Sequence, residues 1–356
     1  MKLFSISYLT FALAGVFLSK TWGASWHEEI AWKSFKALLK SYIGDDADKA
    51  VKKLGDEPFT QIVKLSQPES TLAPIKKSSD SDATPVVQMH GMGDFANDPF
   101  GMVPLQEAIS EYLGGAYVLN VQIGDSNIAD IMNGFIMNLD DQVDYFANVV
   151  QSDVHLKNGF NAVGYSQGNL VIRGYIERYN NPPCLNFISM HGPLAGVGSF
   201  PGCPVERMFC RAFAEFLGAL AYKPLIQDHL AQANYFRDPK KIDQYLEGDR
   251  FLADLNNEVQ LNSTYNDNWA ALNSVCLVKA EGDTVVVPND SEWYGFFEDG
   301  SFDDIWGFKE TPWYKDDLFG LQTLDNANRV FFNVTEGNHL DFATDYLLNL
   351  VGIYFT

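Results

Sequence analysis

The chain has 356 residues, 46% hydrophobic and 20% charged, which is typical of a globular protein and unlike a collagen, a coiled coil or a disordered polyelectrolyte. Its 46 acidic and 25 basic residues give a formal net charge of −21, which repels polynucleotides and argues against a nucleic-acid partner. The length suits one large domain with insertions, or two modest domains.

Residues 1–23 have the features of a signal peptide. Lys2 supplies a positive charge, Leu3 to Leu18 form a nearly uncharged apolar run, and Thr21 and Gly23 are small residues suited to a cleavage site. The alternative is a membrane anchor, but the run is short for a span of about 20 residues. We therefore expect a lysosomal or secreted protein that has no transmembrane anchor after signal cleavage.

Residues 24–85 are expected to lie outside the catalytic fold. Ser25 to Leu65 has the apolar spacing of an amphipathic helical segment. Ser66 to Pro85 is polar and rich in serine and proline, which indicates a linker. The prediction is an accessory segment or pro-segment with a tether at 24–85, followed by the catalytic domain at 86–356.

From residue 86 onward, short apolar runs alternate with amphipathic helical stretches. This alternation predicts a mostly parallel sheet with helices on both faces. It stops at about 193–273, where the pattern is mainly helical and predicts a cap inserted into the core. The predicted strands are Val86–Met89, Ala116–Ile123, Phe160–Gly164, Leu185–Met190, Ser274–Ala280 and Arg329–Val334, and the predicted helices include Val103–Leu113, 143–150, Asn169–Tyr179 and Phe342–Tyr354.

The motif Gly164-Tyr165-Ser166-Gln167-Gly168 lies between a predicted strand and a predicted helix. This context is typical of a nucleophile elbow, a strained turn that tolerates only small residues near the serine. The turn lifts the hydroxyl above the sheet at a helix N-terminus, where backbone N–H groups can stabilise an oxyanion. Ser166 is therefore the candidate nucleophile.

A second oxyanion donor is expected from the loop after an earlier strand. His90-Gly91-Met92-Gly93 follows the first predicted strand and has the His-Gly form found in lipases and esterases. The backbone N–H groups of Met92 and Gln167 are the candidate pair. We expect the His90 side chain to brace this loop rather than to react.

A base and an acid must follow the nucleophile, in the chain order serine, carboxylate, histidine. His339 lies in a Gly-containing turn between the last strand and the last helix, whereas His191 comes too early and His229 lies in the predicted cap. The acid belongs in the loop after Ser274–Ala280. Asp283 is the first choice there, with Glu281 and Asp290 as competitors.

The remaining motifs concern the secretory route. Cys203 and Cys210 are close enough in sequence to close a small loop in an oxidising lumen, whereas Cys184 and Cys276 lie in strand-like runs and are expected to be buried free thiols. No Cys/His spacing indicates a metal site. The glycosylation candidates are Asn262, Asn289 and Asn333.

Taken in order, these motifs resemble the palmitoyl-protein thioesterase family of lysosomal α/β-hydrolases. The resemblance covers roughly Val86 to Phe355 and leaves the first 85 residues unmatched. The similar stretches are His90–Asp94, Gly164–Gly168, Gln232–Pro239, Phe251–Asp254, Asp290–Gly295 and Thr335–Leu340.

The resemblance implies an α/β-hydrolase fold and a serine thioesterase that needs no cofactor. The substrates would be palmitoyl thioesters on cysteines of S-acylated proteins or peptides, and acyl-CoA-like thioesters, cleaved through an acyl-enzyme. The implied roles are Ser166 as nucleophile, His339 as base, Asp283 as acid, Met92 and Gln167 as oxyanion donors, and Cys203 with Cys210 as a disulfide.

Two departures from the family pattern concern the acyl groove rather than the triad. The family's Gly-Gly-Gln-His run is replaced by His191-Gly192-Pro193-Leu194, and Phe95 and Ala96 replace the cysteines that usually follow the oxyanion loop. Two other functions remain open on the sequence. One is a lipase or carboxylesterase with the same triad, and the other is a non-catalytic, lipid-binding relative.

Overall fold

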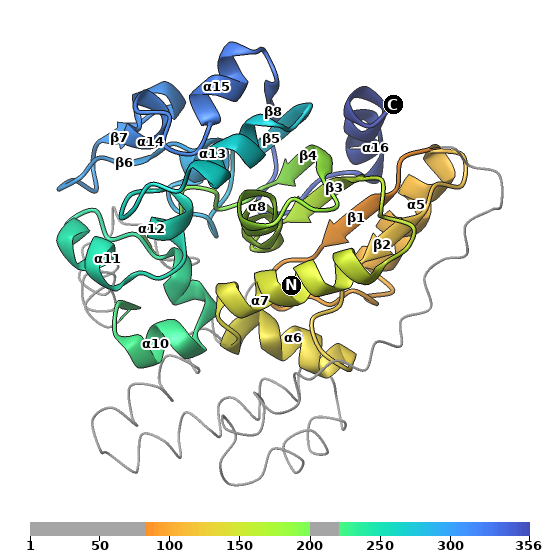
Figure 1. Cartoon of the computed structure of the whole chain (residues 1–356), viewed down its shortest axis with the longest axis horizontal. Helices are drawn as coiled ribbons and strands as arrows, with labels where there is room; N and C mark the ends of the chain where they lie inside the picture. Colours follow the sequence, from red (N-terminus) through yellow and green to blue (C-terminus); the bar gives the residue numbers. More distant parts are fainter. Residues whose placement is uncertain (1–82, 200–220) are drawn as a thin grey trace, which may run out of the picture.

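The computed structural model describes residues 83–199 and 221–356 (Figure 1). The predicted signal peptide, nearly all of the 24–85 segment, and both Cys203 and Cys210 lie outside these residues. The first half contains β1 (Val86–Met89), α5 (Met102–Tyr112), β2 (Val118–Asn120), α6 (Asn127–Ile136), α7 (Leu139–Ser152), β3 (Phe160–Tyr165), α8 (Gly168–Arg178) and β4 (Cys184–Met190).

The second half alternates short helices with the last strands of the sheet. Its elements are α10 (Pro224–His229), η1 (Ala231–Tyr235), α11 (Ile242–Gly248), α12 (Leu252–Leu255), α13 (Ser263–Ala270), β5 (Ser274–Ala280), η2 (Asn289–Trp293), β6 (Phe296–Phe297), β7 (Ile305–Trp306), η3 (Phe308–Glu310), α14 (Pro312–Lys315), α15 (Leu321–Asn326), β8 (Val330–Thr335) and α16 (Thr344–Tyr354).

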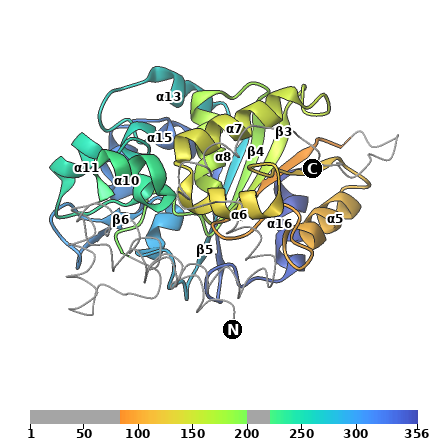
Figure 2. The same cartoon turned by 90° about the horizontal axis from the view of Figure 1, so that it is seen from below.

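Six parallel strands form the central sheet in the order β2-β1-β3-β4-β5-β8. Strands β1 and β3 are buried along their whole length, because helices cover both faces. Helices α7 and α8 pack on one face and α5 and α16 on the other (Figures 1 and 2). This arrangement confirms the predicted α/β-hydrolase fold, with the chemistry expected at the carboxyl ends of the strands.

The described part of the predicted cap is helical, as expected, and contains α10 to α13. A parallel bridge pairs Val197, which follows β4, with Phe236, which follows η1. A second excursion between β5 and β8 was not predicted from the sequence, and it includes the antiparallel pair β6 and β7. The buried Arg237 connects the two excursions, since its guanidinium contacts Glu258 at 3.4 Å and Asp299 at 2.9 Å.

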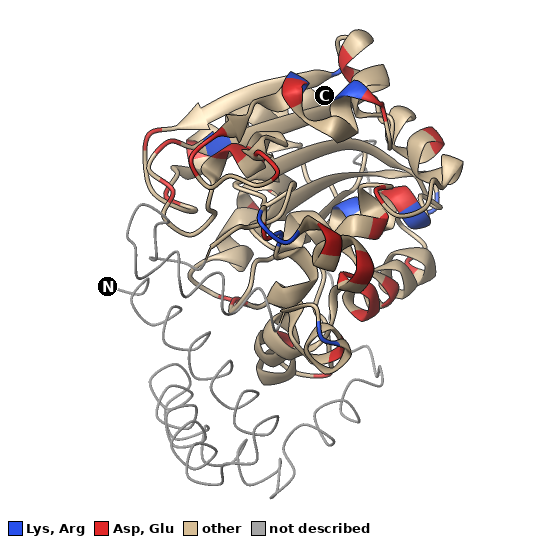
Figure 3. Cartoon of the chain, turned by 90° about the vertical axis from the view of Figure 1, so that its left-hand side faces the viewer, with Lys and Arg blue, Asp and Glu red and all other residues tan. Residues whose placement is uncertain are grey.

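The surface agrees with the acidic composition. Aspartate and glutamate positions are spread over several helices and loops rather than gathered at one place (Figure 3). Cys184 and Cys276 are buried free thiols, which confirms that prediction. Within residues 83–199 and 221–356, we find no helix whose length and apolar character would let it span a bilayer.

Candidate active site

Ser166 occupies the sharp turn between β3 and α8, with a left-handed φ of 51°. Both flanking glycines of the motif are required by close approaches. A Cβ on Gly164 would lie 2.8 Å from Asn169 Cα, and one on Gly168 would lie 2.2 Å from the carbonyl oxygen of Met89. No real Cβ tolerates such distances from backbone atoms, so the sequence motif follows from the packing of this turn against β1.

Ser166, His339 and Asp283 form one hydrogen-bonded series. The distance from Ser166 Oγ to His339 Nε2 is 2.8 Å, and His339 Nδ1 lies 2.5 Å from Asp283 Oδ2. The three residues follow the carboxyl ends of β3, β8 and β5, which lie at the same edge of the parallel sheet, with β4 between β3 and β5. The structure thus brings together the three residues that the motifs and the chain order selected.

Asp283 is held as an ionised acceptor. Its Oδ1 accepts hydrogen bonds from the backbone N–H groups of Val285 at 2.6 Å and Val286 at 2.9 Å. Burial by itself raises the pKa of Asp283, but the hydrogen bonds and the charge interaction with His339 lower it to about 2. The carboxylate therefore stays charged at neutral and mildly acidic pH.

The two competing carboxylates point elsewhere. The Asp290 carboxylate pairs with Lys279 Nζ at 3.1 Å, and Glu281 is exposed. The loop after β5, which carries Asp283, also contacts the turn after β8, which carries His339. Asn338, which precedes His339, accepts a hydrogen bond from the backbone N–H of Thr284 at 3.1 Å, and the Gly282 N–H donates to the Gly337 carbonyl at 3.1 Å, so the two loops are joined by hydrogen bonds.

His191 supports the turn after β8, which carries His339 and Leu340. The sequence analysis set His191 aside because it comes too early in the chain to be the base, and the structure places its buried ring 6.0 Å from that of His339. Its Nδ1 accepts from the backbone N–H of Leu340 at 2.8 Å, so the N–H is on Nε2, which contacts Thr335 Oγ1 at 2.9 Å. Burial and the neighbouring His339 lower the pKa of His191 to about 3, so the ring is neutral.

The loop that carries Met92 packs directly against the elbow. A Cβ on Gly91 would lie 2.9 Å from Ser166 Cβ, so only glycine fits between the loop and the nucleophile. Gln167 is fixed through its side chain, whose Nε2 donates to the Gly134 carbonyl at 2.9 Å and whose Oε1 accepts from Tyr235 at 3.1 Å. The candidate oxyanion donors thus lie on two rigid segments beside Ser166.

The cap reaches this loop through η1. Gln232 Nε2 lies 3.2 Å from Gln167 Oε1 and 2.7 Å from Met92 Sδ. Sequence reasoning did not assign a role to Gln232 or Tyr235, although both belong to a stretch that resembled the family. Side chains from the cap therefore contact both candidate donor residues.

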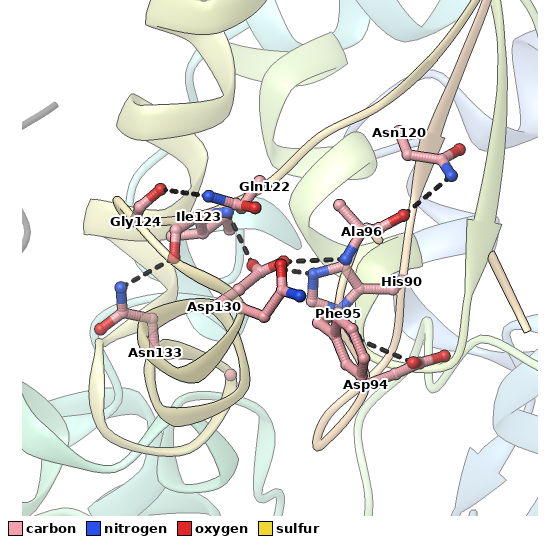
Figure 4. Close-up of polar contacts among 12 residues, drawn as sticks. His90, Asp94, Phe95, Ala96, Asn120, Gln122, Ile123, Gly124, Asp130 and Asn133 are labelled. Atoms are coloured by element: carbon pink, nitrogen blue, oxygen red, sulfur yellow. Dashed lines mark hydrogen bonds and ion pairs between the residues drawn. The ribbon is translucent and has the colours of Figure 1, made fainter. Parts of the chain in front are cut away.

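A buried ion pair between His90 and Asp130 braces the loop that carries Met92, as Figure 4 shows. His90 Nε2 lies 2.9 Å from Asp130 Oδ1, and His90 Nδ1 lies 2.9 Å from the Gly91 carbonyl oxygen. Burial alone lowers the pKa of His90, but the charge of Asp130 raises it to about 9, so both ring nitrogens donate. Because the C=O and N–H of a trans peptide point in opposite directions, holding the Gly91 carbonyl also fixes the N–H of Met92.

Asp130 holds two further segments around the loop. Its carboxylate accepts from the backbone N–H groups of Ile123 at 2.7 Å and Ala96 at 2.9 Å (Figure 4). Asp130 lies on α6, a helix that the sequence analysis missed. The signal for it was Ser126, which caps the helix by accepting from the N–H of Ala129, followed by apolar residues at helical spacing.

One group of side chains among the described residues is close enough to share a cation. Acceptor atoms of Asp283, Glu292 and His339 lie within 4.8 Å of one another. The nitrogen of His339 that faces this group is already hydrogen-bonded to Asp283. Two of the three residues, Asp283 and His339, thus contact each other within the Ser166 series.

Comparison with known proteins places this geometry in context. A sequence model of the family described as palmitoyl protein thioesterase matches residues 85–339. The chain is 38% identical to palmitoyl-protein thioesterase 1 of Caenorhabditis elegans over 76% of this chain and 91% of that protein. It is 39% identical to palmitoyl-protein thioesterase 3 of Dictyostelium discoideum over 73% of this chain and 86% of that protein. Among solved structures, a lipase-esterase related protein of Clostridium acetobutylicum aligns with a TM-score of 0.41 and 11% identity, covering 81% of this chain and all of that one.

Proposed function

Because the chain belongs to the palmitoyl protein thioesterase family, we propose that it hydrolyses palmitoyl thioesters on cysteines of lipid-modified proteins or peptides. The observation that carries the proposal is the hydrogen-bonded series from Ser166 through His339 to Asp283. A serine hydroxyl is a weak nucleophile until such a base and acid activate it.

The reaction would proceed by two acyl transfers. His339 Nε2 takes the proton of Ser166 Oγ as this oxygen attacks the thioester carbonyl carbon, and the resulting imidazolium is stabilised by Asp283. The C–S bond then breaks, and the sulfur leaves as a thiolate or takes the proton from His339. A cysteine thiol has a pKa of about 8.5, so it leaves readily. Water, activated by the same base, hydrolyses the acyl-enzyme and restores Ser166.

The backbone N–H groups of Met92 and Gln167 are the proposed oxyanion donors. The close packing of Gly91 against Ser166 supports this assignment, because it puts the first loop beside the reacting oxygen. Donors fixed in advance stabilise the developing charge without having to reorganise, which makes them worth about 10²–10³ in rate each.

The proposal extends to substrate range and compartment. Acyl-CoA is included, because the reacting C–S bond of an acyl-CoA is the same as that of a palmitoylated cysteine. A signal peptide at 1–23 and a Cys203–Cys210 disulfide are proposed for a protein delivered to the lysosome or secreted. N-terminal sequencing and mass spectrometry of the secreted protein test both, and two free thiols at these positions would refute the disulfide.

The test is hydrolysis of a palmitoylated cysteine peptide and of palmitoyl-CoA by the full chain and by Ser166→Ala. We expect turnover by the native protein and almost none by the variant. A matched oxoester separates the alternatives, since faster cleavage of the oxoester would favour a lipase or carboxylesterase. Failure of a fluorophosphonate to label Ser166 would instead favour a non-catalytic lipid-binding protein.

A further inference from the structure

A second carboxyl group, that of Glu292, lies buried behind the acid of the triad. Glu292 is in η2, in the excursion between β5 and β8, and its side chain is inaccessible to solvent. Its Oε2 accepts a hydrogen bond from the backbone N–H of Ala280 at 2.7 Å. Its Oε1 is buried and accepts a hydrogen from no described group. Acceptor atoms of Asp283 and His339 lie within 4.8 Å of the Glu292 carboxyl group.

The surroundings of Glu292 do not suit a second negative charge. Asp283 already takes three donors, namely the backbone N–H groups of Val285 and Val286 and the ring of His339. Its low pKa shows that it carries the negative charge of this pocket. A second ionised carboxylate here would be repelled by Asp283, and its Oε1 would be left without a partner in a dry environment.

Among the described residues, the basic group that acts on Glu292 is held by other partners. This group is Lys279, whose ammonium is 3.1 Å from the Asp290 carboxylate and lies over the ring of Trp293 at 4.4 Å. Both ionisable rings on the other side, His339 and His191, face Asp283 or the turn after β8. Burial, and then the adjacent Asp283, raise the pKa of Glu292 well above its ordinary value.

From this geometry we infer that Glu292 is a neutral carboxylic acid whose Oε1–H donates to Asp283. A proton at this position resolves both problems at once, because it removes the second charge and gives the orphaned oxygen a partner. The hydrogen-bonded series then has four members, from Ser166 through His339 and Asp283 to Glu292. The inference rests on the proposed roles of the first three, and Glu292 is a positioning residue that acts through Asp283.

The donor would have two effects on catalysis. It fixes the rotation of the Asp283 carboxylate, so that Oδ2 stays aimed at His339. It also withdraws charge from that carboxylate, so Asp283 holds a protonated imidazole less firmly and the free base persists to lower pH. The enzyme would therefore keep more of its activity in an acidic medium than a triad without this fourth group.

The test compares Glu292→Gln with Glu292→Ala in the full chain, with Glu281→Gln as the matched control. The glutamine amide can donate to Asp283 and accept from Ala280, so it imitates the neutral acid, and we expect kcat within about threefold of the native value. Alanine removes the donor, and we expect kcat to fall about 10- to 100-fold with KM little changed, as for one hydrogen bond to a charged group. The acidic limb of its kcat/KM profile should move to higher pH.

Loss of activity in Glu292→Gln as severe as in Glu292→Ala would show that an ionised carboxylate is needed and would overturn the inference. So would native kinetics and an unshifted pH profile in both variants. If Glu292→Ala does not fold, the glutamine variant still decides, together with infrared spectroscopy. The native protein should show a carboxylic-acid C=O stretching band at neutral pH that Glu292→Gln lacks, and absence of this band refutes the neutral acid.

The same variants separate this inference from the proposed function. The rate at which a fluorophosphonate modifies Ser166 measures activation of the nucleophile and needs no thioester substrate. Should the native protein fail to cleave thioesters, the proposed substrate is wrong. An unchanged labelling rate in Glu292→Ala would contradict the positioning role independently of any substrate.

Discussion

The backbone N–H of Leu340 donates to Nδ1 of His191 at 2.8 Å, so a buried neutral histidine anchors the residue next to the catalytic base candidate. This contact joins the carboxyl end of β4 to the loop after β8. It also makes the stability of the protein depend on the protonation state of His191.

We predict that His191 makes the fold sensitive to acid. Burial lowers its pKa from 6.5 to about 3, so the unfolded chain takes up a proton between these values that the folded protein excludes. The free energy of unfolding therefore falls as the pH drops from 6.5 towards 3, by up to about 1.4 kcal/mol per unit.

His191→Asn keeps an acceptor for Leu340 and suits the left-handed φ of 49° at this position. Urea denaturation at several pH values should show a shallower loss of stability in this variant than in the native protein. An identical pH dependence in the two would contradict the assignment. His191→Phe, which has no acceptor, should also lower kcat.

Asp283→Asn is expected to lower kcat by about 10²–10⁴, because the amide removes the charge that stabilises the imidazolium and can select the wrong tautomer. The good thiolate leaving group favours the lower end of this range. Glu281→Gln and Asp290→Asn serve as matched controls, since one side chain is exposed and the other pairs with Lys279. If Asp290→Asn abolishes turnover while Asp283→Asn keeps a near-normal kcat, Asp290 rather than Asp283 is the acid of the triad.

Asp130→Asn should reduce kcat about 10- to 100-fold with little change in KM, less than deletion of an oxyanion donor, since it only loosens the Met92 N–H. The substitution removes the charge that raises the pKa of His90 to about 9. In the native protein the brace weakens only as the pH rises through 9. In the variant the loss should begin at lower pH, and a kcat profile with the native alkaline limb would refute the brace.

Asn262 is predicted to carry an N-linked glycan in protein secreted from eukaryotic cells, unlike Asn289 and Asn333. Asn262 is exposed at the start of α13. The amide nitrogen of Asn289 donates to the Ala280 carbonyl at 3.0 Å, and that of Asn333 contacts Cys276 Sγ at 3.2 Å in β8. Asn262→Gln should abolish the mass shift on glycosidase treatment, and a glycopeptide containing Asn333 would contradict this prediction.

The sequence predicted those parts of the fold and of the candidate site that depend on a local residue pattern. The apolar runs predicted all six strands of the main sheet, with bounds within one residue of those observed except at β2, where Ala116–Ile123 was expected and Val118–Asn120 is found. Chain order and two glycine turns selected Ser166 and His339, because the elbow and the base turn need small residues at fixed places. These features depend on neighbours within a few residues.

The supporting residues could not be found in this way. His90 and Asp130 are 40 residues apart, and His191 and Leu340 are 149 residues apart. The excursion that carries Glu292 had no clear periodicity, because its strands β6 and β7 contain two residues each. What makes these residues functional is the packing of distant segments, which no local pattern contains.

The order of strands in the sheet also predicts when activity returns during refolding. Ser166 and His339 are separated by 173 residues, and the base arrives on the loop after β8, an edge strand that pairs only with β5. We expect the centre of the sheet, β1, β3 and β4, to form before that strand docks. During refolding, fluorophosphonate labelling of Ser166 should therefore return when β8 docks on β5, and not when the tyrosines and phenylalanines at the centre of the sheet become buried. The recovery of enzymatic activity would then report the last step of folding.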